Sequence, residues 1–210
     1  MVAVVAGATA VGAAVGAALL PHVVARTART VARHPVAERV GMSVALGVAW
    51  GALAWHEGTT LRLAALLVFA AAGVALSVVD LREKRIPNAI LLVAAPLVLA
   101  LTVADAAVTG RWEALLGAAL GSAGLFGIYL VLALLIPRGM GMGDVKLAAL
   151  LGFVLGGSGW GTWIVGFSAG ILVGGLAAAI TLLARQRGPE GTLPYGPALV
   201  IGALIALLLT

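Results

Sequence analysis

Long apolar segments alternate with short polar connections along the whole chain. Because a helix rises about 1.5 Å per residue, about 20 apolar residues cross a hydrocarbon core of about 30 Å. The pattern predicts eight membrane helices, at residues 1–20, 41–55, 61–79, 89–108, 114–136, 145–157, 163–184 and 194–210. The segment 145–157 is short for a crossing. We still expect it to cross, because otherwise Arg185 and Arg187 would lie outside, against the positive-inside rule.

Basic residues gather in the connections on one side of the predicted bundle. All of the 13 Lys and Arg residues except Arg62 and Arg111 fall on this side. Cytoplasmic connections carry the excess of Lys and Arg, so this side is predicted to be cytoplasmic and both termini to lie outside. The connection 21–40 is then a short basic cytoplasmic loop. No polar region is left over for a second domain, so residues 1–210 are predicted to form one all-α, membrane-embedded domain.

Composition narrows the possible chemistry. Hydrophobic residues make up 62% of the chain, charged residues only 10%, and the mean hydropathy is +1.16, which excludes an ordinary soluble domain. The chain has no cysteine, so disulfides, thiolate metal sites and cysteine nucleophiles are excluded. His22, His34 and His56 are isolated, so we predict no metal site. For the net charge of +5, anionic lipid headgroups are a better match than nucleic acid.

One predicted helix has a face of small residues. Gly166, Gly170 and Gly174 recur at every fourth position, which places them on the same side of the helix 163–184. Small residues let two membrane helices approach closely. We therefore predict that this face packs against a neighbouring helix rather than binding a ligand.

Two aspartates are the candidate chemical groups. Asp80 opens the charged connection 80–88, and Asp144 follows a run in which Gly139, Gly141 and Gly143 alternate with other residues. Both aspartates fall on the predicted cytoplasmic side, and ionisable groups at the edge of a membrane domain indicate function. Glycines allow another chain to approach the backbone closely, although the same run also suits a flexible connection.

Four neighbouring residues complete the candidate site. Pro87 suits the start of a helix and is followed by Asn88. Lys146 is either part of the site or an anchor at the headgroup level. Glu83 is a candidate contact for a basic substrate segment, and Glu190 is a weaker one. Instead of a catalytic role, Asp80 could have only a structural one, as a loop carboxylate in an ordinary ion pair with Arg82 or Arg85.

Two adjacent carboxyl groups provide hydrolytic chemistry without a metal or cofactor. Like charges in a poorly solvated site cannot both ionise cheaply, so such a pair holds one proton. The ionised carboxylate can then activate a water, and the protonated one can donate to the carbonyl oxygen and the leaving amine. The pair Asp80 and Asp144 therefore suggests aspartic peptide hydrolysis.

Three motifs in order resemble the type IV prepilin peptidases, membrane aspartic proteases with a G-x-G-D motif. They are Asp80 with the basic run to Ile86-Pro87-Asn88, then Gly141-Met142-Gly143-Asp144-Val145-Lys146-Leu147, then Pro194-Tyr195-Gly196-Pro197. The resemblance implies that Asp80 and Asp144 are catalytic. It also implies a prepilin or pseudopilin substrate, in which a basic leader precedes an apolar helix, cut at the cytoplasmic face of the cytoplasmic membrane. Longer family members carry a cysteine-containing loop after the first helix and also methylate the product. The segment 21–40 lacks cysteine, so the expected activity is that of a peptidase.

Two other functions remain open from the sequence. Presenilin-type proteases also use G-x-G-D together with P-A-L, which Pro197-Ala198-Leu199 spells, but they cut within the membrane helix. A small transporter or assembly scaffold, with the aspartates binding a proton or cation, is the alternative from another class.

Overall fold

The described residues of this computed structural model, 1–30, 32, 34–135, 141–183 and 194–210, form only helices as regular elements. The helices are α1 (Val2–Thr27), α2 (Pro35–Glu57), α3 (Leu61–Glu83), α4 (Asn88–Thr109), α5 (Trp112–Leu135), α6 (Met142–Ser158), α7 (Trp160–Leu183) and α8 (Gly196–Leu209). The predicted all-α class and the eight helices are confirmed. Six helices, α1 to α5 and most of α7, are long and apolar enough to cross a membrane. The chain is therefore a multi-pass membrane protein.

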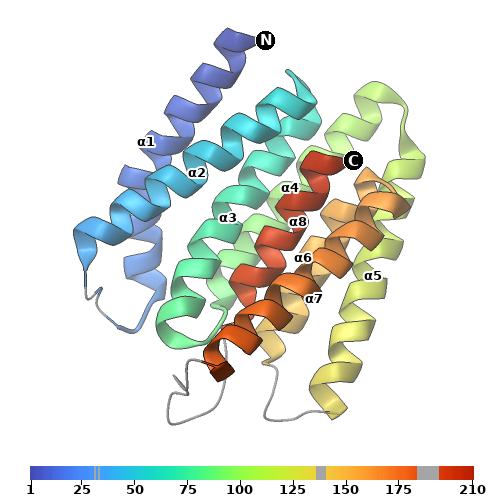
Figure 1. The fold of residues 1–210 in the computed structure, drawn as a ribbon. Coiled ribbons are helices and arrows are strands. Elements are labelled where there is room, and N and C mark those ends of the chain that lie inside the picture. Colours follow the sequence, from blue (N-terminus) through green and yellow to red (C-terminus); the bar gives the residue numbers. More distant parts are fainter. Residues whose placement is uncertain (31, 33, 136–140, 184–193) are drawn as a thin grey trace.

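Successive helices run in opposite directions (Figure 1). The C-terminal ends of α1, α3, α5 and α7 and the N-terminal ends of α2, α4, α6 and α8 lie at one end, which we call the aspartate end because it holds Asp80 and Asp144. Both chain termini lie at the opposite, far end. Helix α3 contacts α1, α2, α4 and α8, and its face toward them is largely buried. This central helix therefore carries Asp80 to the aspartate end.

Helix α6 is longer than predicted and runs from one end of the bundle to the other. It begins at Met142, before Asp144, and ends at Ser158. The hydroxyl of Ser158 accepts a 2.9 Å hydrogen bond from Arg62, which lies at the start of α3 and so at the far end. This path agrees with the predicted crossing of the segment 145–157 and does not agree with a re-entrant segment, which would return to the aspartate end.

The connection between α1 and α2 is shorter than the predicted loop 21–40. Helix α1 continues through Pro21 to Thr27, and α2 begins at Pro35. Val24 is completely buried, so packing sustains the last turn of α1 although its charged residues lower the local hydropathy. Proline at the first helical position costs no hydrogen bond, which explains the early start of α2.

The glycine face predicted on α7 packs against neighbouring helices. A side chain at Gly166 would lie 2.6 Å from Leu155 of α6, and one at Gly174 would lie 2.2 Å from the ring of Tyr195. At Gly170 the backbone of α7 closely approaches Gly202 of α8. The packing role that we predicted for these glycines is confirmed, and Gly174 leaves the space that the Tyr195 ring occupies.

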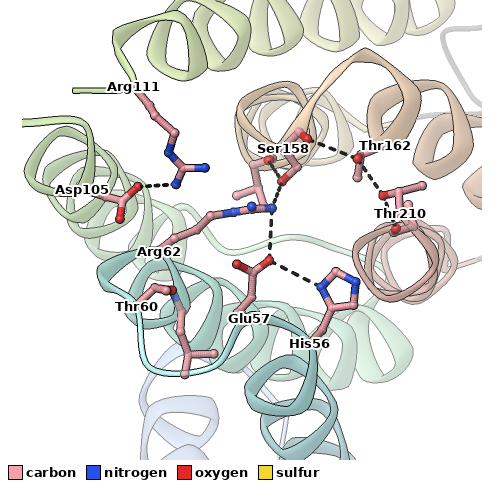
Figure 2. Close-up of polar contacts among 12 residues, drawn as sticks. His56, Glu57, Thr60, Arg62, Asp105, Arg111, Ser158, Thr162 and Thr210 are labelled. Atoms are coloured by element: carbon pink, nitrogen blue, oxygen red, sulfur yellow. Dashed lines mark hydrogen bonds and ion pairs between the residues drawn. The ribbon is translucent and has the colours of Figure 1, made fainter. Parts of the chain in front are cut away.

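The two arginines that depart from the charge pattern are both paired at the far end (Figure 2). Arg62 lies 3.2 Å from Glu57, which is also 3.7 Å from His56. Arg111 binds Asp105 at 3.1 Å. A carboxylate therefore pairs with each of these guanidinium groups.

The two far-end ion pairs are expected to differ in their contribution to stability. The Glu57 side chain is only 8% exposed and has two partners, so Glu57→Gln should lower the free energy of unfolding by about 1–3 kcal/mol. The Asp105 side chain is similarly buried, at 11% exposed, but it has one ion-pair partner, Arg111, which is 47% exposed and can be solvated alone, so Asp105→Asn should cost less, about 0–1 kcal/mol. Unfolding of both purified variants in detergent tests this order, and equal losses would contradict it.

Candidate functional site

Asp80 is buried at the end of α3 and accepts a hydrogen bond from another helix. The residue is 3% exposed, and its Oδ2 atom accepts a 2.8 Å bond from the backbone N–H of Gly196, at the start of α8. We predicted that Asp80 opens a loop, but it lies one turn inside the helix. Helix α3 continues through Leu81, Arg82 and Glu83, because all three residue types favour the helical conformation. This preference does not depend on whether a residue is apolar or charged. The helix then ends at Lys84, whose φ is 51°.

Asp144 lies in the first turn of α6, whereas the predicted helix began one residue after it, at residue 145. Its Oδ2 atom accepts a 3.1 Å hydrogen bond from the N–H of Gly141, and its own N–H donates to the Gly141 carbonyl at 3.0 Å. Its Oδ1 atom is buried and has no hydrogen-bond partner among the described residues. An unpaired buried acceptor costs about 1–3 kcal/mol. This oxygen is therefore the atom of Asp144 that is free to bind a proton, a water or a substrate.

The side chain of Ile86 fills the space beside both aspartates. A side chain at Gly143 would lie 2.7 Å from Ile86 Cβ, and one at Gly196 would lie 3.2 Å from Ile86 Cδ1 and 2.9 Å from Asp80 Oδ2. Two glycines, each next to or bonded to a candidate aspartate, therefore let α6 and α8 close around Ile86. The carboxylates of Asp80 and Asp144 lie near enough for their charges to repel each other.

Two tyrosines border the same region. The rings of Tyr129, on α5, and Tyr195, just before α8, have their centroids 6.4 Å apart. Burial raises the pKa of the Tyr195 hydroxyl, and the charge of nearby Asp144 acts in the same direction. The hydroxyl thus stays protonated and can act as a donor beside Asp144. The Pro194–Pro197 motif pointed to Tyr195 and the Ile86-Pro87-Asn88 motif pointed to Ile86, but no sequence signal pointed to Tyr129.

Two other predicted residues meet at the edge of this region. Lys146 Nζ donates a 3.0 Å hydrogen bond to Asn88 Oδ1, which links α6 to the start of α4. Pro87 is buried directly before Asn88. Both side chains of the bonded pair are exposed, so they are available to a partner at the membrane face.

The carboxylate of Glu83 binds groups in the connection between α1 and α2 and does not point to a substrate contact. Its carboxylate accepts bonds from the N–H groups of Arg29 and Thr30 at 2.5 and 2.7 Å, and Arg85 binds it at 2.6 Å. It thus fastens the connection between α1 and α2 to the end of α3. Arg82 pairs with Glu38, so neither basic residue considered for Asp80 binds it. Glu190 lies outside the described residues.

Replacing Gly196 is expected to disturb Asp80 selectively. The added methyl group of Gly196→Ala would meet Asp80 Oδ2 at 2.9 Å, so that the carboxylate or the N–H that binds it must move. Reactions depend steeply on the positions of catalytic groups, and we expect kcat for peptide hydrolysis to fall about 10–100-fold with KM little changed. Kinetics on purified protein measure this, with Gly175→Ala, which meets no atom within 4 Å, as the control. A wild-type kcat in Gly196→Ala would contradict it.

The chain matches one known protein family. Residues 67–182, more than half of the chain, match the type IV leader peptidase family. This range includes Asp80 and Asp144 but ends before Tyr195 and Gly196.

Several curated relatives have the same name, prepilin leader peptidase/N-methyltransferase. Those from Stutzerimonas stutzeri and Pseudomonas aeruginosa are each 32% identical over 84% of this chain, and that from Bacillus subtilis is 33% identical over 72%. The matched region covers 58% of each relative, so the chain spans less than two thirds of their length. No solved structure matches the chain.

Proposed function

Because this chain belongs to the type IV leader peptidase family, we propose that it is a membrane aspartic endopeptidase that removes the basic leader of prepilins or pseudopilins. One observation carries the proposal: buried Asp80 and half-buried Asp144, from helices far apart in the sequence, lie at one end of the bundle on either side of Ile86. The names of the curated relatives support the substrate class. Methylation is not part of the proposal.

In the proposed mechanism the two aspartates hold one proton between them. The ionised carboxylate removes a proton from a water, whose oxygen attacks the carbonyl carbon of the scissile peptide bond. The protonated carboxyl group donates to the carbonyl oxygen as it becomes negative, and a proton passes to the leaving nitrogen when the C–N bond breaks. The N–H of Gly196 holds Asp80 in place, and Oδ1 of Asp144, which has no partner among the described residues, is the oxygen left for the proton or the water.

The proposed location is the cytoplasmic face of the cytoplasmic membrane. In the part of the chain that the structure describes, the Lys and Arg residues other than Arg62 and Arg111 belong to helix ends and connections at the aspartate end, which the positive-inside rule assigns to the cytoplasm. These residues also suit contact with anionic lipids. A substrate whose apolar helix lies in the bilayer would present its leader junction at this level. We propose that residues 1–210 act in this way as one membrane-embedded peptidase domain that needs no metal or cofactor.

Cleavage of a prepilin tests the proposal directly. The purified protein is incubated in vesicles with a type IV prepilin from Pseudomonas aeruginosa, and the product is followed by its size and by the mass of its new N-terminus. We expect a single cut between the basic leader and the apolar helix. A cut inside the apolar helix would indicate a presenilin-type protease instead, and no cut at all would contradict a peptidase function.

A further inference from the structure

A groove runs along the membrane-facing side of α4 and α6. It encloses about 600 Å³ and is lined mainly by apolar side chains. These include Leu92, Ala95 and Leu99 of α4 and Ala149 and Phe153 of α6. From Asn88 to Leu99 the groove follows α4 for about 16 Å, at 1.5 Å per residue, or half of a hydrocarbon core. It is thus long enough to lie along about half of an apolar membrane helix.

The groove is open to the lipid and has one polar end. Helix α4 packs mainly against α3 and only lightly against α5 and α6, and Leu92 is 74% exposed. At the aspartate end, the hydrogen-bonded Lys146 and Asn88 form the mouth. The lining therefore changes from apolar to polar at the level where a membrane helix would reach the headgroups.

The mouth of the groove lies within one helical turn of Asp144 along α6. Asn88 follows Ile86 by two residues, and Ile86 contacts the positions of Gly143 and Gly196 beside the two aspartates. Lys146 lies two residues after Asp144 on α6. Residues two apart on a helix point to different sides, so a chain that leaves the groove between Asn88 and Lys146 passes around the first turn of α6 to reach the carboxylates.

We propose that the apolar helix of the substrate binds in this groove, with its leader junction emerging between Asn88 and Lys146. This inference rests on the proposed function and adds the surface that holds the substrate. The charges around the mouth favour one position for the leader. Lys146 pairs with no carboxylate in the described part of the chain, so its charge repels a basic leader. The carboxylates of Asp80 and Asp144 attract the leader. The opposing charges draw the junction from the mouth toward the aspartates.

Site-specific photocrosslinking tests the location of the helix. A benzoylphenylalanine is placed at Ala95, inside the groove, or at Ala100, which is exposed on α4 but does not line the groove. Both are made in the Asp80→Asn, Asp144→Asn background and mixed with Pseudomonas aeruginosa prepilin in vesicles of phosphatidylethanolamine and phosphatidylglycerol. We expect prepilin to crosslink through its apolar helix at Ala95 and not at Ala100. Equal crosslinking at both positions, or crosslinks at Ala95 to lipid alone, would overturn the inference.

Filling the groove provides a second measurement. Ala95→Trp should raise KM for the prepilin about 10-fold, because the indole occupies space that the substrate helix needs, whereas Ala100→Trp should keep the wild-type KM. Thermal unfolding of both variants identifies any loss that comes from misfolding. A wild-type KM in a folded Ala95→Trp variant would overturn the inference.

The two hypotheses can fail separately. If the Asp80→Asn and Asp144→Asn variants still process prepilin, the proposed function is wrong, whatever the crosslinks show. If these variants are inactive but prepilin does not crosslink at Ala95, only the groove inference is wrong.

Discussion

Replacing either Asp80 or Asp144 by asparagine is expected to slow leader removal by about 10²–10⁴-fold, the usual contribution of general acid–base catalysis. Asparagine keeps the size of the side chain and can still accept the hydrogen bond from Gly196 or Gly141. It cannot take up the proton of a water or donate a carboxylic proton. Because the two carboxyl groups act as a unit, the double variant should be little slower than either single one.

Asp105→Asn is the matched control for this experiment. Asp105 is also a buried aspartate on a membrane helix, but it lies at the far end and pairs with Arg111 (Figure 2). Each variant is co-expressed with prepilin, and processing is followed by the size of the product, with membrane insertion checked separately. Full processing by Asp80→Asn or Asp144→Asn would refute the proposed pair, and loss of processing in Asp105→Asn would point to a general effect on folding.

The apolar pattern predicted which helices exist better than it predicted where they end. Hydropathy ends α3 at Val79, yet the helix continues to Glu83, and α1 passes its predicted end by seven residues to reach Thr27. Charged and polar residues such as Arg82 and Glu83 form helix readily, and hydropathy does not register this preference. Capping decides the true ends, as at Lys84, where the backbone turns into the left-handed region.

The sequence predicted both aspartates on one side of the membrane, but it could not predict what holds Asp80 in position. The charge pattern is enough for the first step, because the positive-inside rule assigns each connection to a face. The second step depends on the packing of α8 against α3, which delivers the N–H of Gly196 to Asp80. No local pattern predicts such a bond between distant helices. Glu83 shows the same limit, since the backbone groups it binds lie in another connection.

Gly121→Ala on α5 is expected to destabilise the protein and to slow processing, although alanine is the better helix former. A side chain at Gly121 would lie 2.4 Å from the carbonyl oxygen of Gly152 on α6, and one at Gly152 would lie 2.3 Å from that of Gly121. The two backbones are therefore in direct contact. Overpacking of this kind costs about 1–3 kcal/mol, more than the roughly 1 kcal/mol that alanine gains in helix propensity.

The effect of Gly121→Ala on processing follows from what α6 carries. Pushing α6 away from α5 moves its first turn, and with it Asp144, relative to Asp80 on α3. Gly127→Ala on the same helix is the control, because a side chain there meets no atom within 4 Å. We expect this control to be as stable as the wild type or slightly more so, with normal processing. Thermal unfolding in detergent and prepilin processing measure both effects, and equal stability of the two variants would show that the contact between α5 and α6 does not hold Asp144 in place.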